Sequence, residues 1–272
     1  MAVVTGGASG IGYALAAALM ARGDIVTVAD IDEQGAARCA EHLASRYPGQ
    51  ADGAGLDVQD AAAVACMMQS VKDQHGRLDL VFNNAGIGVG GPADEHSLEH
   101  WNRAIDVNLR GVVHGVHAAY PIMLEQGFGH IVNTASLAGL FPVPYKIAYV
   151  TTKYAVVGLS LALRNEAAKT GVKVSVICPG YVETPLLDNV NPGLPQTSLG
   201  GCTREAAILE QGRLCRPDQV AHDVMRGIER NDAVIVTTTS RLSRSIAKIS
   251  PALTLWCATL PYRRVSPTDQ NS

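Results

Sequence analysis

Short runs of β-branched and other apolar residues alternate with longer segments of helical periodicity along most of this chain. The strand-like runs are Ala2–Val4, Ile25–Ala29, Ala54–Leu56, Leu78–Phe82, His130–Ala135, Val172–Cys178 and Val234–Thr237. The helical patterns between them are Ile11–Arg22, Asp32–Tyr47, Asp60–His75, Leu98–Gln126, Ile147–Lys169 and Asp218–Arg230. Apolar strands that alternate with helices form a parallel sheet covered on both faces. Because crossovers between parallel strands are right-handed, the order predicts a single doubly wound α/β sheet, the Rossmann fold.

The chain is long enough for one large domain. Its 272 residues are 47% hydrophobic, and no linker rich in Pro, Gly or Ser divides it before about residue 185. We therefore place one α/β domain at residues 1–240 and leave 241–272 as a C-terminal tail. Only four residues precede Thr5, so the first strand is expected to be short, and we expect the natural chain to begin upstream.

Charge and cysteine usage restrict the partners and the compartment. The net charge is −3 and like charges form no long run, which argues against nucleic acid as a partner. No apolar stretch reaches the roughly 18 residues that a membrane span needs. The tail joins apolar and basic residues, so we expect it to pack on its own or a neighbouring subunit, with membrane-surface contact or disorder as alternatives. The six cysteines form no C-x-x-C pair, which favours a reducing compartment, the cytoplasm.

A glycine-bearing loop, Thr5-Gly-Gly-Ala-Ser-Gly-Ile-Gly12, joins the first strand to the first helix. Glycines let the backbone turn sharply and approach a pyrophosphate at the helix N-terminus. A tight turn without a ligand is the alternative. The residues that we expect to contact a dinucleotide here are Gly6, Ser9, Gly10, Ile11 and Gly12.

Asp30 ends the second strand, where a carboxylate accepts hydrogen bonds from an adenosine ribose. The same charge would repel a 2′-phosphate, so NAD is favoured over NADP. Arg38 is the nearest basic residue downstream. The alternative is that Asp30, like Asp32, only caps the following helix.

Tyr149 and Lys153 stand at the start of a predicted helix, four residues apart and therefore on one face. A free tyrosine has a pKa of about 10, too high for a base at neutral pH, and a nearby ammonium lowers it. Ser136 follows a predicted strand at the carboxyl end, where open α/β sheets bind ligands. Its hydroxyl is a candidate to hold a substrate oxygen.

Together these features resemble the short-chain dehydrogenase/reductase family, in its compact subclass of about 250 residues. The matching pieces occur in family order and cover residues 1 to about 236. They are T-G-G-A-S-G-I-G at 5–12, D-V at 57–58, N-N-A-G at 83–86, Asn108, Ser136, Y-x-x-x-K at 149–153 and P-G-Y-V-E-T at 179–184. The resemblance implies an oxidoreductase that transfers a hydride between a nicotinamide cofactor and an alcohol or ketone.

The resemblance also implies a role for each matched residue. Tyr149 would be the general acid/base, and Lys153 would lower its pKa and bind the nicotinamide ribose. Ser136 would position the carbonyl, and Asn108 would hold a water in the proton relay. Asn83 would be structural and bond to a neighbouring strand. The further cofactor contacts implied are Asp57, Val58, Asn84, Val182 and Thr184.

The segment at 185–212 lies where the family carries a substrate lid, with Gly200-Gly201 as a candidate hinge. Its composition predicts an uncharged, apolar alcohol or ketone, although such leucines also pack on their own helix. The apolar lid residues are Leu186, Leu187, Leu194, Leu199, Ile208 and Leu209. The other expected pocket residues are Gly88, Leu137, Val143, Tyr145 and Tyr181.

Other functions stay open at this point. An NADP-dependent carbonyl reductase is one, and a catalytically idle dinucleotide-binding sensor is another, because fold does not determine function. No metal is expected: His96, His100, His114 and His117 lack Asp, Glu or Cys at ligand spacing, which favours surface or subunit contacts. By resemblance we expect a homodimer or homotetramer through helices at 98–126 and 147–169.

Overall fold

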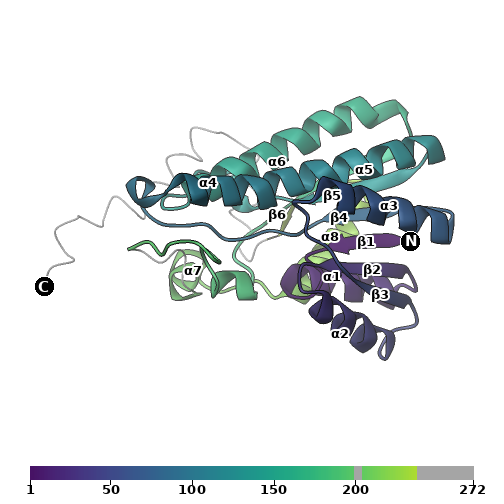
Figure 1. Cartoon of the computed structure of the whole chain (residues 1–272), viewed down its shortest axis with the longest axis horizontal. Helices are drawn as coiled ribbons and strands as arrows, with labels where there is room; N and C mark the ends of the chain where they lie inside the picture. The colour runs from purple at the N-terminus through teal and green to yellow at the C-terminus, as the bar shows by residue number, and fades with distance from the viewer. Residues whose placement is uncertain (199–203, 238–272) are drawn as a thin grey trace, which may run out of the picture.

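The computed structural model describes residues 1–198 and 204–237. In this part of the chain seven parallel strands form one sheet in the order β3-β2-β1-β4-β5-β6-β7 (Figure 1). The strands are β1 (Ala2–Thr5), β2 (Ile25–Asp30), β3 (Gln50–Gly55), β4 (Leu80–Asn83), β5 (Gly129–Thr134), β6 (Val172–Pro179) and β7 (Val234–Thr237). The predicted doubly wound sheet is confirmed.

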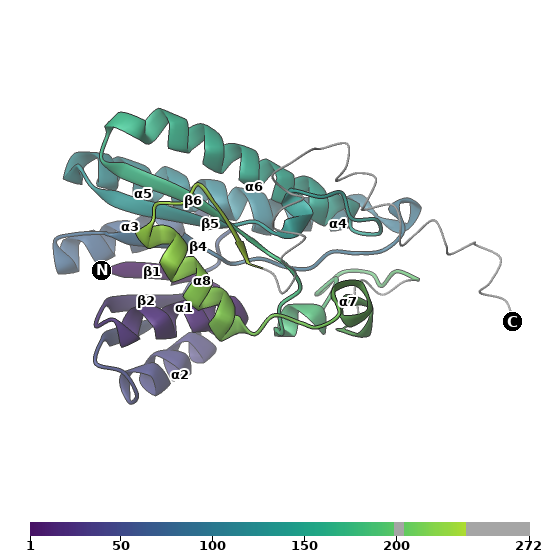
Figure 2. The same cartoon turned by 180° about the vertical axis from the view of Figure 1, so that it is seen from behind.

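Helices cover both faces of the sheet, and each face has its own apolar core (Figures 1 and 2). Leu15, Leu19 and Val224 belong to the core of one face, and Met68 and Met123 to that of the other. The first face carries α1 (Gly10–Ala21), α2 (Glu33–Ala44) and α8 (Pro217–Glu229). The second carries α3 (Ala61–His75), α4 (Leu98–Ile105), α5 (Gly111–Gln126) and α6 (Ile147–Glu166). A further short helix, α7 (Arg204–Gln211), lies within the segment at 185–212.

The helical stretch predicted over Leu98–Gln126 is confirmed, with one local difference. A π-helical turn, Asp106–Arg110, joins α4 directly to α5. Such a turn widens the backbone ring locally, and periodicity counted at 3.6 residues per turn does not reveal it. The turn contains Asn108, which is fully buried.

The first strand agrees with expectation and the third differs from it. β1 has four residues, as many as β4 and β7, and pairs with both neighbours, so its shortness leaves the sheet complete at that point. The third strand was predicted only at Ala54–Leu56, yet β3 runs over Gln50–Gly55. This edge strand has the sequence QADGAG, with no β-branched residue to mark it.

The topology brings the candidate residues to one edge. The chain winds from β1 toward β3, then returns to β4 and continues in the opposite direction, so the strand order reverses between β1 and β4. A crevice forms outside the carboxyl ends of the strands at such a point. The glycine loop after β1 and Asn84 after β4 therefore face each other there. Among the described helices, none is both long and apolar enough to cross a membrane.

Candidate active site

A cavity of about 730 Å³ opens along the carboxyl ends of the strands. Residues that directly follow or end β1, β2, β4 and β5 line it, namely Gly6, Asp30, Asn84 and Thr134. The other predicted site residues along its wall are Ser9, Gly10, Ile11, Asp57, Val58, Ser136, Tyr149, Lys153, Val182 and Thr184. Of the predicted set, only Gly12 and Asn108 are not among the lining residues.

The glycine loop has the backbone shape that a closely approaching phosphate requires. Gly6 and Gly10 have φ of 62° and 53°, a region that favours glycine. A Cβ at Gly6 would lie 2.8 Å from Ala85 Cα, and one at Gly10 would lie 2.9 Å from Thr184 Cγ2. Ser9 is the N-cap of α1, is exposed, and makes no capping bond with its side chain. The N-terminus of α1 and this hydroxyl therefore fit an anionic pyrophosphate.

Gly12 has a packing role. A Cβ there would lie 2.0 Å from the Gly6 carbonyl oxygen, so only glycine allows the helix to begin directly against the loop. The same Cβ would lie 2.8 Å from Asn84 Nδ2. Gly12 thus supports the shape of the cofactor cradle without lining it.

The Asp30 carboxylate is held beside the glycine loop. Its Oδ2 accepts a hydrogen bond from Ala8 N at 3.0 Å, and its Oδ1 accepts one from Asp32 N at 3.1 Å. Asp32, and not Asp30, caps α2, because its Oδ1 accepts from Gly35 N. Arg38 is 67% exposed in its side chain and lies 3.6 Å from Asp32. Helix capping therefore does not explain Asp30.

The residues after β3 line the cavity beside Asp30, whose carbonyl oxygen accepts a hydrogen bond from Leu56 N at 2.7 Å. Asp57 Oδ1 accepts from Gln59 N at 3.0 Å, and Arg103 Nη1 donates to Gln59 Oε1 at 3.0 Å. The Val58 carbonyl is hydrogen-bonded to the His114 ring at 2.9 Å. Gln59 and Arg103 line the cavity but escaped sequence analysis, because neither lies in a recognisable motif.

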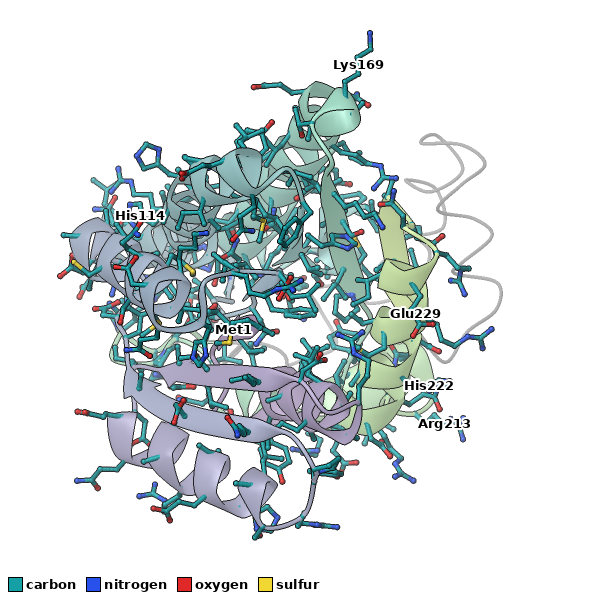
Figure 3. All side chains as sticks on the ribbon, turned by 90° about the vertical axis from the view of Figure 1, so that its right-hand side faces the viewer. Met1, His114, Lys169, Arg213, His222 and Glu229 are labelled. Atoms are coloured by element: carbon teal, nitrogen blue, oxygen red, sulfur yellow. The ribbon has the colours of Figure 1, made fainter. Side chains whose placement is uncertain are left out.

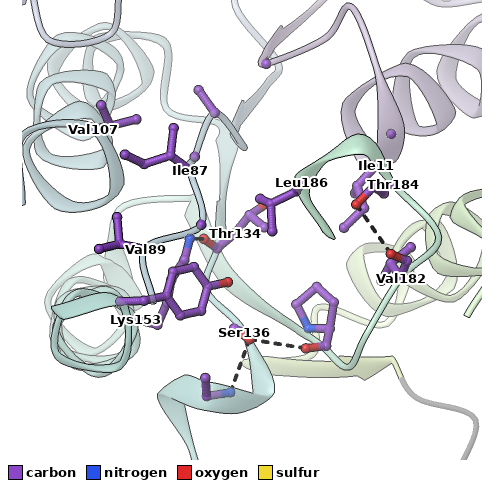
Figure 4. A pocket seen from close by; sticks show the side chains of 18 of the residues that line it. Ile11, Ile87, Val89, Val107, Thr134, Ser136, Lys153, Val182, Thr184 and Leu186 are labelled. Carbon is purple, nitrogen blue, oxygen red and sulfur yellow. Dashed lines mark hydrogen bonds between the residues drawn. The ribbon is translucent and has the colours of Figure 1, made fainter. Parts of the chain in front are cut away.

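Ser136, Tyr149 and Lys153 meet on one side of the cavity. Lys153 is 3% exposed, and its Nζ donates to the Thr134 carbonyl at 3.0 Å (Figure 4). The same Nζ lies 5.5 Å from the Tyr149 ring centroid. Ser136 Oγ accepts from Ala138 N and lies 3.5 Å from the Pro179 carbonyl oxygen.

Burial dominates the protonation equilibria here. It raises the pKa of Tyr149, and hydrogen bonding to the Ser136 side chain partly offsets that rise. Burial also lowers the pKa of Lys153 to about 8. Burial thus shifts the protonation equilibria of both groups toward their neutral forms.

Asn108 lies behind the cavity wall and holds the loop after β4. Its Oδ1 accepts from Ile87 N at 2.8 Å, and its Nδ2 donates to Ile87 O at 3.0 Å. A Cβ on Gly86 would lie 3.1 Å from Asn108 Oδ1 and 3.6 Å from Lys153 Nζ, so Gly86 separates the two side chains. The predicted part of Asn108 in a proton relay stays a prediction.

The comparison with protein families agrees with this arrangement. The family model described as short chain dehydrogenase matches residues 1–195. The chain belongs to the short-chain dehydrogenase family. It is therefore an oxidoreductase, and the resemblance stated from its motifs is confirmed.

Relatives and solved structures support the assignment. A D-β-hydroxybutyrate dehydrogenase from Rhizobium meliloti is 36% identical over 213 residues, which cover 77% of this chain and 81% of the relative. A short-chain dehydrogenase/reductase from Burkholderia phymatum, solved in complex with NAD, has a TM-score of 0.81 and 31% identity, with 100% of this chain and 97% of that chain covered. A short-chain type dehydrogenase/reductase from Mycobacterium marinum has a TM-score of 0.76 and 27% identity, covering 87% and 93%.

The proposed substrate side of this short-chain dehydrogenase is mainly apolar, and six of the residues predicted to line it do so. Tyr145 was predicted as lining but is 49% exposed, because a positive φ of 60° turns the chain there. Leu194 packs in a core cluster with Val89 and Ala104, and Ile208 is exposed. The predicted residues that do line the cavity are Gly88, Leu137, Val143, Tyr181, Leu186 and Leu187.

Some predictions lie outside the described residues, and several further lining residues were not predicted. Leu199 and the Gly200-Gly201 hinge fall outside residues 1–198 and 204–237, as does the tail, and the Leu209 side chain is not described. Lys146 and Gln211 line the cavity but were not singled out. The signal for Lys146 was its position three residues before Tyr149, on the first turn of one helix.

Two of the four histidines, His100 and His114, form hydrogen bonds within the described part of the chain. His100 is fully buried and bonds to Ser97 and to the Pro195 carbonyl, so a surface role is wrong for this residue. His130, which was not considered, is buried between strands. In the described ranges no three His, Cys, Asp or Glu side chains gather as metal ligands. Asn83 is structural as predicted, since its Nδ2 donates to Asn133 Oδ1 on β5 at 2.9 Å.

Proposed function

We propose that the protein is an NAD(H)-preferring dehydrogenase that interconverts a secondary alcohol and a ketone, with Tyr149 as the general acid/base. The meeting of Ser136, Tyr149 and Lys153 beside one end of a cavity whose other wall is the glycine loop carries this proposal. A sensor without turnover would have no need for a buried ammonium beside a half-buried phenol that lines the cavity. That pair favours catalysis over the idle alternative.

The residues divide the work as follows. A bound nicotinamide supplies or accepts the hydride. Ser136 and Tyr149 hold the substrate oxygen between two hydroxyls, and in reduction Tyr149 donates its proton to that oxygen. In oxidation the Tyr149 phenolate accepts the alcohol proton, and Lys153 stabilises that phenolate by its charge. Val89 and Leu186 on the cavity wall limit water around the reacting atoms.

NAD preference rests on Asp30. Its carboxylate stands at the cofactor cradle, held by Ala8 N, where it can accept from ribose hydroxyls and repel a 2′-phosphate. The rival, an NADP-dependent carbonyl reductase, has Arg38 in its favour, because Arg38, Asp30 and Ser9 line one small neighbouring cavity. Arg38 is already paired with Asp32, which weakens that alternative. The NAD-containing structure of the Burkholderia relative also supports NAD.

Titration of the purified protein with NADH and NADPH, followed by cofactor fluorescence, tests the assignment. We expect NADH to bind at least about tenfold more tightly, a difference of roughly 1.4 kcal/mol. Asp30→Ala should reduce that preference by improving NADPH binding. Equal or tighter binding of NADPH by the unaltered protein would make the NADP-dependent reductase the better assignment. Failure of both cofactors to bind would remove the proposed function.

The proposed compartment is the cytoplasm. Within the described ranges Cys39, Cys66, Cys178 and Cys215 are free thiols, and thiols persist in reducing compartments.

A further inference from the structure

Lys146 places a positive charge at the substrate side of the cavity. It is half-buried, lines the cavity, and is the N-cap residue of α6, three positions before Tyr149. Residues three apart on a helix are neighbours, with about 5–6 Å between their Cβ atoms. The acidic side chains among the described lining residues, Asp30 and Asp57, follow β2 and β3, on the cofactor side. Arg103 also lies on the cofactor side, where it donates to Gln59, so both acidic lining residues have a cation near them whereas Lys146 stands apart from them.

The Lys146 ammonium is held in place. Its Nζ donates to Tyr181 Oη at 3.0 Å and lies 4.6 Å from the Tyr181 ring centroid. The Tyr181 backbone is fixed in turn by Gln211, whose Oε1 accepts from Tyr181 N at 2.7 Å and whose Nε2 donates to Tyr181 O at 2.9 Å. Three segments distant in sequence thus fix one cation beside the predicted catalytic tyrosine. A flexible surface lysine would need none of these contacts.

This cation has no counter-ion in the described part of the chain. Its hydrogen bond there is to Tyr181, and no carboxylate forms an ion pair with it. An ammonium has three N–H donors, so two are left for a ligand. Partial burial of a charge without a partner is unfavourable. The first turn of α6 contains no acidic residue and no side-chain cap, so the helix dipole adds to the positive potential.

We propose that Lys146, oriented by Tyr181, binds the carboxylate of the substrate, which is a short hydroxy acid or the corresponding keto acid. An ammonium and a carboxylate form charge-assisted hydrogen bonds, which are stronger than neutral ones. The closeness of Lys146 to Tyr149 limits the carboxylate to a few bonds from the reacting carbon. Leu137, Val143 and Leu186 then contact the short apolar chain. This inference rests on the proposed function and revises the expectation of an uncharged substrate.

Reduction of a keto acid at this site needs only the reduced cofactor, the keto acid and a proton. In reduction a bound NADH would supply the hydride to the carbonyl carbon and would become NAD⁺, while Tyr149 gives its proton to the carbonyl oxygen and is reprotonated by solvent. The carboxylate on Lys146 is not consumed. It positions the carbonyl, so its loss should appear mainly in KM.

Steady-state reduction by NADH tests the proposal with matched acids and esters. The acids are 2-oxopropanoate, 3-oxobutanoate and 4-oxopentanoate, each compared with its methyl ester. For the preferred acid we expect Lys146→Met to lower kcat/KM about 100-fold, mainly through KM, and to leave the ester little changed. Lys146→Arg should retain much of the preference for the acid. Lys169→Met is the matched control, because Lys169 is exposed and lies far from the cavity, where it points outward (Figure 3).

Two results would overturn the subsite. One is an unaltered protein that prefers no acid over its ester, and the other is Lys146→Met with an unchanged ratio of acid to ester. If the unaltered protein reduces neither acids nor esters, the proposed function fails for these compounds, and thermal unfolding in the presence of NADH decides the subsite. A rise in Tm with 3-oxobutanoate that is lost in Lys146→Met then supports it. No rise in Tm for the unaltered protein contradicts it.

Discussion

Lys153 and Tyr149 show how burial sets the chemistry of single residues. In water at neutral pH a lysine side chain is charged and a tyrosine side chain is neutral. In this site burial raises the pKa of Tyr149 and lowers the pKa of Lys153 to about 8. The Lys153 ammonium keeps one partner, the Thr134 carbonyl, which anchors it beneath the phenol. A positively charged oxidised nicotinamide beside these groups would favour the phenolate. The residue pair is thus suited to exchange a proton with a substrate.

Replacement of Tyr149 by Phe tests this directly. Tyr149→Phe should lower kcat/KM by about 10²–10⁴-fold, the usual contribution of a general acid/base, with little effect on folding. Tyr47→Phe is the matched control and should leave the rate unchanged, because Tyr47 follows α2 and does not line the cavity. A Tyr149→Phe variant with full activity would remove Tyr149 from the mechanism.

The pH profile gives a second readout of the same prediction. Oxidation needs the Tyr149 phenolate, so its rate should rise with pH, whereas reduction needs the phenol and should fall at alkaline pH. Because burial raises the pKa of Tyr149, both changes belong on the alkaline side in the protein without cofactor. Profiles of kcat/KM in the two directions should therefore have opposite slopes. Slopes of the same sign would contradict the assignment.

At the scale of elements, a glycine sets how closely α5 packs on the sheet. A Cβ on Gly115 would lie 1.9 Å from Asn83 Oδ1, the atom next to the amide that bonds to Asn133. Asn133 continues this buried chain by donating to Ser160 Oγ on α6 at 3.0 Å. The close approach of α5 therefore packs against a chain of buried hydrogen bonds that runs from Asn83 on β4 through Asn133 on β5 to Ser160 on α6.

Gly115→Ala should accordingly destabilise the protein by about 2–4 kcal/mol, because it overpacks the contact and disturbs buried hydrogen bonds. Urea unfolding at one protein concentration measures the change. Asn83→Ala in the same background removes the overlapping amide, so the double variant should lose less stability than the two single variants together. Simple additivity would show that the two residues do not interact.

At the scale of the molecule, His130 links acid stability to the sheet. It lies buried on β5 and bonds to Ser175 Oγ at 2.8 Å, with Lys173 and Arg164 as nearby cations. Burial first, and then these cations, lower the pKa of His130 to about 4. The unfolded chain, with a histidine pKa near 6.5, therefore binds more protons between these values. Stability that is complete above pH 6.5 is lost as the pH falls toward 4.

His130→Gln, which keeps a hydrogen-bonding side chain, should reduce this acid sensitivity. Between pH 7.5 and pH 5 the free energy of unfolding of the unaltered protein should fall by about 2 kcal/mol more than that of the variant. Urea unfolding at the two pH values provides the comparison. The same loss in both proteins would mean that other groups control acid unfolding.

Oligomerisation also belongs to the whole molecule and stays a prediction. Val113 on α5 and Ile147 and Tyr154 on α6 are exposed apolar side chains on the helices for which we expect subunit contact. We propose these faces as the contact surface.

Much of this protein follows from local sequence signals. β-Branched runs and helical periods determine the sheet, and the glycine loop, Asp30 and the Tyr149–Lys153 spacing are contiguous or nearly so. These motifs depend on interactions between residues close in sequence, such as the φ values open to glycine or the spacing of one helix turn. Weak local signals were less informative: β3 lacks β-branched residues, and the π-helical turn at 106–110 breaks no hydrophobic pattern.

Only the tertiary structure decided the contacts between distant segments. It assigns Asn108 to the Ile87 backbone and Gly12 to the packing of the loop, although both had been expected at the cofactor or the relay. It turns Tyr145 outward, and it joins Lys146 to Tyr181 across 35 positions of sequence. Local propensity contains no information on such pairs, because their geometry depends on how α6 packs against the sheet that contains β6. The charge at the substrate side is therefore a property of the fold.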